Sequence, residues 1–187
     1  MKKLLLFIFA IFMMFISPVK AEYYGPVWNS GVIKVYIPND NYTEMMKEAF
    51  QKWESNINKQ IVFQYVTDKE EADIDVDFVE KVDGSDGEIG SYNTTVQGGA
   101  IVHGQIFIAT KGNQRYSQDL IYTTMLHEIG HILGLPGTNR NIGIMHEPIS
   151  ETQDIVKNDI VRLYKFYKWS IINNGNAINK LPTVNLR

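Results

Sequence analysis

The sequence predicts a single α+β domain, because short β-branched segments are interleaved with segments in which apolar residues recur every three or four positions. Its 187 residues are 44% hydrophobic and 21% charged, a composition typical of a globular domain and not of a disordered chain. The chain has no cysteine, so disulfides, thiolate nucleophiles and cysteine-bound metals are excluded. Any bound metal must use nitrogen and oxygen ligands, and only four histidines are available.

The first 21 residues have the pattern of a secretory signal peptide. Lys2 and Lys3 precede an apolar run over residues 4–16, and small residues lead to a cleavage site after Ala21. The run is shorter than the ~20 residues needed to cross a bilayer, so we expect cleavage, export to the periplasm or the exterior, and no membrane attachment afterwards. Cleavage removes three lysines and no acids, which takes the formal net charge from −3 to −6 and argues against nucleic acid as a partner.

A strand, a helix and a second strand are expected next. Residues 32–37 are β-branched and aromatic and are followed by a Pro-Asn-Asp turn. Thr43 is expected to cap the helix, whose apolar stripe includes Trp53 as a core anchor. Residues 61–66 are again rich in strand-forming side chains.

The middle of the chain predicts a half-buried strand followed by a loop. Residues 72–79 alternate strictly between apolar and acidic side chains. The expected buried face carries Ile74, Val76 and Phe78. Residues 82–99 are rich in glycine and aspartate, so we expect an exposed loop there.

A strand over residues 100–109 is expected after this loop, with Val102, Ile106 and Ile108 on one face. His103 lies on the opposite face. A lone histidine on a strand is more often structural than a metal ligand, so we do not assign it to a metal.

Two helices complete the predicted domain. Ser117 is expected to cap the first helix, and Gly134 is expected to end it. The last helix is predicted over residues 152–169 from its apolar stripe. The domain thus spans residues 22–170, and the asparagine-rich tail at 171–187 has no firm pattern.

The first of these helices carries the sequence HEIGH at residues 127–131. Residues four apart on a helix lie one turn apart on the same face, so His127 and His131 can bind one ion. A catalytic zinc accepts imidazole nitrogens at about 2.0–2.1 Å and keeps one position open for water. Glu128 adjoins the first histidine, where its carboxylate can take a proton from that water and pass it to a leaving amine. The pattern predicts metal-assisted hydrolysis of an amide.

The extended segment HEIGHILGL resembles the HExxHxxGxx signature of metzincin metalloproteases, most closely their matrixin branch. The segment IMHEP at residues 144–148 resembles the Met-turn of the same proteins. The order of predicted strands and helices over residues 31–168 is also similar to that of a matrixin catalytic domain. The resemblance implies a twisted, mostly parallel sheet with an active-site helix and a C-terminal helix.

The resemblance also implies a secreted zinc endopeptidase and roles for individual residues. The family's two zinc-binding histidines correspond to His127 and His131. Its general acid and base corresponds to Glu128, and its supporting methionine corresponds to Met145. Residues 148–150 would form part of the wall of the specificity pocket. The strand ending near Ala109 would offer its edge to an extended peptide or protein substrate.

The third zinc ligand of the family is missing from its usual position. Six residues after His131, where the family has a histidine or sometimes an aspartate, this chain has Gly137. The candidates to replace it are a second water molecule or one of Thr138, Asn139, His146 and Glu151. Neutral Asn or Thr oxygens are poorer zinc ligands than imidazole, so weaker metal binding is expected unless His146 is the ligand. The sequence leaves this choice open.

Two other functions are also considered. Glu151 follows His131 by twenty residues, a spacing that resembles the glutamate ligand of gluzincin proteases, although that class lacks the glycine turn and the Met-turn. The second alternative is a degenerate metzincin fold that acts as a peptide-binding or interaction module. Glu128 argues against this module, because peptide binding has no chemical need for a base at that position.

Regulation and additional metals also differ from the family pattern. A propeptide cysteine cannot block the zinc, because the chain has none, and residues 80–102 contain no histidine for a second, structural zinc. Asp83, Asp86 and Glu88 offer oxygens to calcium, but a solvated acidic loop accounts for them better.

Overall fold

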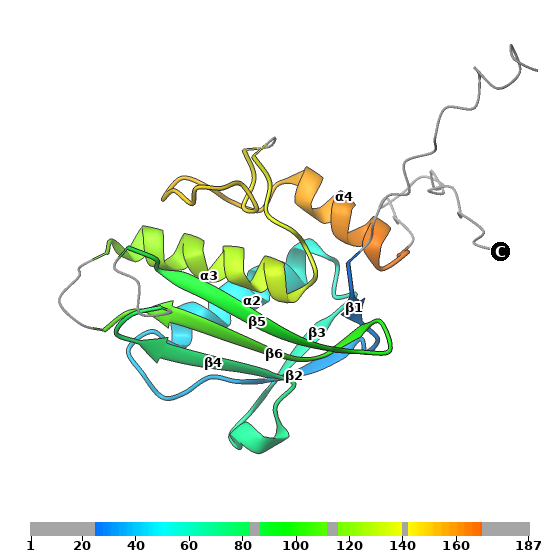
Figure 1. The fold of residues 1–187 in the computed structure, drawn as a ribbon, viewed down its shortest axis with the longest axis horizontal. Coiled ribbons are helices and arrows are strands. Elements are labelled where there is room, and N and C mark those ends of the chain that lie inside the picture. Colours follow the sequence, from blue (N-terminus) through cyan, green and yellow to red (C-terminus); the bar gives the residue numbers. More distant parts are fainter. Residues whose placement is uncertain (1–24, 83–86, 112–115, 140–141, 170–187) are drawn as a thin grey trace, which may run out of the picture.

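The computed structural model describes residues 25–82, 87–111, 116–139 and 142–169 (Figure 1). The predicted signal peptide and the asparagine-rich tail lie outside these ranges. Within them, no helix has both the length and the apolar character needed to cross a membrane.

The centre of the fold is a six-stranded sheet (Figure 1). Five strands run parallel, and β5 pairs with β6 in the antiparallel direction. The prediction of an α+β fold with a mostly parallel sheet is therefore confirmed. In spatial order the strands are β1 (Val27–Trp28), β6 (Ala100–Ala109), β4 (Ile74–Val79), β2 (Val32–Tyr36) and β3 (Val62–Val66), with β5 (Gly90–Gln97) beside β6.

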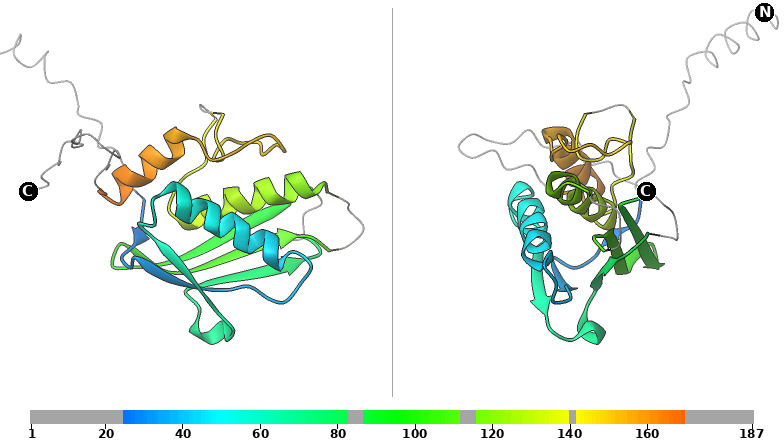
Figure 2. Two further views of the ribbon diagram at one scale, coloured as in Figure 1. Left: turned by 180° about the vertical axis from the view of Figure 1, so that it is seen from behind. Right: turned by 90° about the vertical axis from the view of Figure 1, so that its left-hand side faces the viewer.

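Two helices, α2 (Thr43–Asn56) and α3 (Gln118–Ile132), lie side by side on one face of the sheet (Figure 2). The fully buried Trp53 links them, because its Nε1 donates to the carbonyl oxygen of Leu126 at 2.8 Å. The shorter α4 (Lys157–Phe166) lies beyond α3, and a 3₁₀ turn at Lys69–Glu71 precedes β4. The hydrophobic core lies between the sheet and the α2–α3 pair.

The strict alternation of β4 correctly predicts its faces: Ile74 and Val76 are fully buried and Phe78 nearly so. The other three predicted strands, at residues 32–37, 61–66 and 100–109, match β2, β3 and β6 to within one residue. The exception is β5, because the expected loop over residues 82–99 contains this strand. Its Ser, Asn and Thr side chains lack an apolar pattern, and it is held by backbone pairing with β6.

The strand that carries a free edge is β5 and not the one predicted. β6, which ends at Ala109, pairs with β5 on one side and with β4 on the other, so it cannot accept a further strand there. Among the described residues β5 pairs with β6 alone. Its outer backbone groups are therefore free to pair with another extended chain.

The predicted face of Val102 is wrong. This side chain is 40% exposed, and Ile101 is buried in its place. The register of β5 against β6 is irregular here, since Thr95 pairs with His103 and Val96 with Ile101, so that Val102 is passed over. Such a bulge shifts the alternation of inward and outward side chains by one position.

The ends of the helices follow local side-chain chemistry only in part. Ser117 caps α3 as predicted, since its Oγ accepts from the amide of Leu120 at 3.1 Å, and Gly134 turns the chain with φ = +97°. Thr43 does not cap α2: it is the first helical residue, and its hydroxyl donates to the carbonyl of Pro38.

The prediction that the last helix begins near residue 152 is wrong, since α4 begins at Lys157. The side chain of Gln153 instead binds the preceding loop, with its Nε2 donating to the carbonyl oxygens of His146 at 3.3 Å and Pro148 at 3.1 Å. These tertiary contacts compete with helix formation in this segment.

Candidate metal centre

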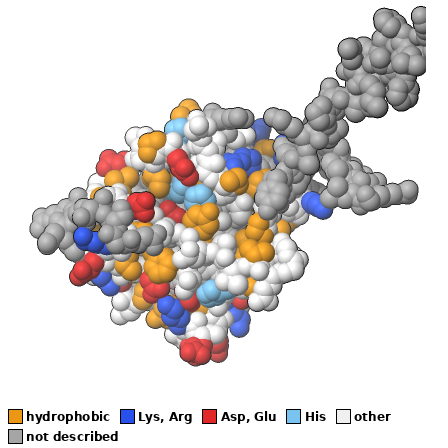
Figure 3. Space-filling view, in the orientation of Figure 1, with side chains coloured by type: hydrophobic (Ala, Val, Ile, Leu, Met, Phe, Trp, Pro, Cys, Tyr) orange, Lys and Arg blue, Asp and Glu red, His pale blue; other side chains and the backbone are white. Residues whose placement is uncertain are grey.

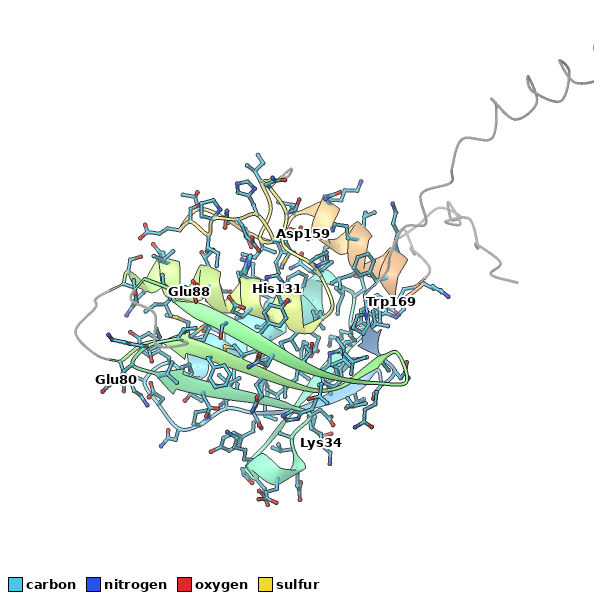
Figure 4. The ribbon with its side chains drawn as sticks, in the orientation of Figure 1. Lys34, Glu80, Glu88, His131, Asp159 and Trp169 are labelled. Carbon is cyan, nitrogen blue, oxygen red and sulfur yellow. The ribbon has the colours of Figure 1, made fainter. Side chains whose placement is uncertain are left out.

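The helix α3 brings His127 and His131 together as its periodicity predicts. Both side chains are buried between α3 and its neighbours, and Figure 4 shows His131 between α3 and β5. The two Nε2 atoms are 2.9 Å apart. Two nitrogens from consecutive turns of one helix therefore face a common point.

Backbone carbonyl groups orient both imidazole rings. His127 Nδ1 lies 2.7 Å from the carbonyl oxygen of Ile144, and His131 Nδ1 lies 2.8 Å from that of Leu135. A carbonyl oxygen only accepts, so each Nδ1 carries the proton and each Nε2 presents a lone pair. Two facing lone pairs at 2.9 Å repel each other, and a cation between them removes that repulsion. These two side chains fit a metal ion.

The protonation states of the histidines also suit a metal. Burial lowers the pKa of His127. Burial and, secondarily, the neighbouring His127 lower the pKa of His131 to about 4. Neutral imidazole is the form that binds zinc, so neither ring must lose a proton at neutral pH before it binds the ion.

A carboxylate completes the group. Glu147 Oε1 lies 3.9 Å from His131 Nε2 and 4.0 Å from His127 Nε2. Among the described histidine and acidic side chains, these three form the single group of metal-ligand atoms within 4.8 Å of one another. Glu147 was not among the ligands predicted from the sequence. It belongs to the Met-turn segment, and residue spacing alone does not show that this segment lies next to Gly137.

Glu128 lies beside the histidine pair and is only 4% exposed. Burial, and then the negative charges of Glu147 and Glu88, raise its pKa to about 8. The start of β5 packs directly on it: a Cβ on Gly90 would lie 2.7 Å from Glu128 Oε1 and would overlap Thr124. Only glycine fits here, and the start of β5 therefore packs closely on the Glu128 side chain.

The Met-turn packs against the active-site helix and orients one of its histidines. Met145 is fully buried, and its sulfur fills the space that a Cβ on Gly130 would need. The adjacent Ile144, whose carbonyl orients His127, donates its amide to Asp159 Oδ2 at 3.1 Å. Asp159, at the start of α4 (Figure 4), is fully buried. The first turn of α4 thus fixes the loop that orients the His127 ring, a candidate metal ligand.

A pocket of about 940 Å³ opens beside the metal centre. The segment from Gly87 to Tyr92, which includes the start of β5, lines one part of it, and Glu147, Pro148 and Ile149 line another. Of residues 148–150, expected in a pocket wall, Pro148 and Ile149 line this pocket and Ser150 does not. On the face seen in Figure 3, histidine and acidic side chains reach the surface between hydrophobic groups.

Tyr92 is a second residue that the sequence analysis missed. Its ring stacks on His131, with centroids 4.3 Å apart and an interplanar angle of 11°. It comes from β5, which the composition predicts to be a loop, so no sequence signal pointed to it. The stack closes one side of the metal centre.

Most predicted replacements for the third ligand lie elsewhere. Glu151 accepts a hydrogen bond from Ser117 at the start of α3, so the gluzincin-like spacing does not bring it to the histidines. His146 is outside the ligand group as well. Asn139 is exposed, and Thr138 pairs its backbone with the Met-turn.

Two further predictions concern other metals. His103 lies on β6 with its Nε2 3.5 Å from Asp75 Oδ2, and belongs to no group of metal ligands in the described ranges. Asp83 and Asp86 lie outside the described residues, and Glu88 lines the pocket. The described part of the chain gives no support for a calcium site.

Comparison with known proteins agrees with this geometry. Residues 32–168, more than half of the chain, match the family model described as Matrixin. A search of curated proteins found no match. The family is one of zinc-dependent metalloproteases, and the mostly parallel sheet with its helices agrees with such a catalytic domain. The chain therefore belongs to the matrixin family.

Proposed function

We propose that the protein is an exported zinc endopeptidase that hydrolyses peptide bonds in extended peptide or protein substrates. The observation that carries the proposal is the pair of Nε2 lone pairs facing each other at 2.9 Å beside the buried Glu128. Export is supported by the N-terminal pattern of lysines, apolar run and small residues.

Individual residues have separate roles in the proposed reaction. His127 and His131 would hold the ion, and the bound zinc would supply a Lewis acid for water and for the scissile carbonyl. Glu128 accepts a proton from the attacking water and donates it to the leaving amine. The carbonyls of Ile144 and Leu135 hold the two rings in the orientation that binding requires.

The free edge of β5 is the proposed substrate site. A peptide added to this edge would run along the pocket and past Glu128, with main-chain hydrogen bonds supplying affinity independent of sequence. Tyr92 and Ile149 supply apolar contacts on the pocket walls. This arrangement favours an endopeptidase, because nothing on the described chain closes the groove for a free terminus.

Removal of metal tests the function. Purified protein should cleave denatured casein, lose that activity with a chelator, and recover it when zinc is added back, because water attack depends on the ion. Product peptides are measured by mass spectrometry. Zinc binding and casein binding with no new termini would show that the protein is an interaction module and not a peptidase.

Gly90→Ala tests the position of Glu128. The new Cβ would overlap Thr124 and lie 2.7 Å from Glu128 Oε1, so it must displace the carboxylate. Because displacement by ~1 Å can cost about 100-fold in rate, we expect kcat to fall between tenfold and 100-fold with the zinc Kd unchanged. Gly31→Ala is the matched control, because its backbone is not in the left-handed region and the added Cβ would make only an ordinary contact, 3.5 Å from the carbonyl oxygen of Gln60. Equal activity of the two variants would contradict the assigned packing.

A further inference from the structure

We propose that Glu147 is the third zinc ligand of this chain, in the place of the side chain that Gly137 lacks. The inference rests on the proposed zinc function. It assigns a ligand that comes from the Met-turn and not from the segment after the active-site helix.

The distances around Glu147 suit a ligand. Four donors at about 2.0–2.1 Å from a tetrahedral zinc lie about 3.3 Å from each other. The Glu147 carboxylate is 3.9 and 4.0 Å from the two histidine nitrogens, and those nitrogens are 2.9 Å apart. The three separations bracket the tetrahedral value, so small rotations of the side chains are enough. The Glu147 side chain is 58% exposed and has room for such a rotation.

The position of Gly137 explains why this ligand is possible. A Cβ on Gly137 would overlap Glu147 Oε1 and would lie 2.6 Å from its carboxyl carbon. The Glu147 carboxylate therefore fills the space that any side chain at position 137 would enter. A ligand from position 137 and one from position 147 exclude each other, and this chain has the second.

Backbone hydrogen bonds hold Glu147 in the segment next to Gly137. The amide of Thr138 donates to the carbonyl of Met145 at 2.8 Å, and the amide of Glu147 donates to the carbonyl of Thr138 at 3.1 Å. These bonds form a short bridge between Thr138 and His146. Neighbouring side chains in an extended segment point to opposite sides, so Glu147 faces the two zinc histidines and His146 does not.

The chemistry of the carboxylate fits as well. Glutamate oxygen is an established zinc ligand at about 2.0–2.2 Å, and two histidines with one glutamate are a known catalytic set. The resulting centre carries one positive charge less than a centre with three histidines. Glu128 stays outside the ligand set and keeps its carboxylate for proton transfer.

The zinc Kd of the purified protein, measured by competition with a chromophoric chelator, tests the assignment. Glu147→Gln should raise the Kd at least about 100-fold, because an amide replaces a charged ligand. Glu151→Gln is the matched control: it makes the same change four residues further along the chain, at a residue bound to Ser117, and should leave the Kd unchanged. Equal zinc Kd values for both variants would overturn the proposal.

A second variant tests the shared space directly. The double variant Gly137→His, Glu147→Ala should bind zinc at least tenfold more tightly than Glu147→Ala alone, because an imidazole then enters the vacated space. No recovery would count against exclusion between the two positions. X-ray absorption of the zinc-loaded wild type should show two imidazoles and oxygen ligands, and a third imidazole would overturn the assignment in favour of His146.

Failure of the ligand assignment differs from failure of the function. If the wild type binds no zinc, the proposed peptidase is wrong. If it binds zinc through His127 and His131 and cleaves casein, but the Glu147→Gln protein binds equally well, only the third ligand is wrong.

Discussion

Replacement of Glu128 by glutamine should lower kcat/KM for peptide cleavage by about 10²–10⁴-fold, the usual contribution of a general acid or base. Glutamine has nearly the same shape, but its amide cannot accept and return the proton. The side chain is 4% exposed and lies beside the metal ligands without belonging to their group. The zinc Kd should therefore stay within a factor of about three.

The measurement combines initial rates on a quenched fluorescent peptide with a zinc titration of the same preparation. Glu88→Gln is the matched control, because Glu88 also lines the pocket and its charge also acts on Glu128, yet it is exposed. We expect that variant to keep its rate within a few-fold. A Glu128→Gln enzyme with a normal rate, or one that no longer binds zinc, would contradict the assigned role.

Trp53→Ala should lower the free energy of unfolding by about 3–5 kcal/mol, the range for removal of a buried tryptophan. Trp53 is fully buried, and its indole donates to the carbonyl of Leu126 in α3. Its ring also reaches Gly130, which lies between His127 and His131 in the sequence and where an added Cβ would lie 3.1 Å from Cζ2. The cavity would therefore open beneath the metal centre.

Urea unfolding followed by circular dichroism measures this loss, with chelator present so that zinc binding does not stabilise the native state. Trp53→Phe keeps most of the ring but loses the hydrogen bond, so its loss should be clearly smaller than that of the alanine variant. A loss below about 1 kcal/mol for Trp53→Ala would show that α2 and α3 do not depend on this side chain.

The strands and helices with a strong apolar pattern were predictable. β4 alternates strictly because one face lies on the core, and α3 begins directly after Ser117 because the serine hydroxyl accepts from a free amide of its first turn. β5 was not predictable from its residues. Its polar side chains show no face, and its position depends on hydrogen bonds to β6. The predicted face of Val102 was wrong for the same reason, since the bulge depends on how β5 and β6 pair.

In the candidate site, too, some residues could be predicted from local sequence and others could not. His127 and His131 are four residues apart on one helix, so helical geometry alone predicts that their rings meet. Glu128 is the next residue after His127, and the tertiary structure shows that it lines the same pocket as the two histidines. Their catalytic and ligand roles stay predictions. Tyr92 was not predicted from the sequence to lie in the site, because it reaches His131 from the edge strand β5.

The histidine pair, the adjoining carboxylate and the missing side chain at Gly137 can be read from the chain directly, because each depends on residues within a turn or two of one helix. The identity of the third donor cannot be read in this way. Glu147 reaches the centre through backbone bonds between two loops and through space left open ten residues earlier. Contacts between distant segments depend on how the loops pack, and spacing along the chain does not encode that packing.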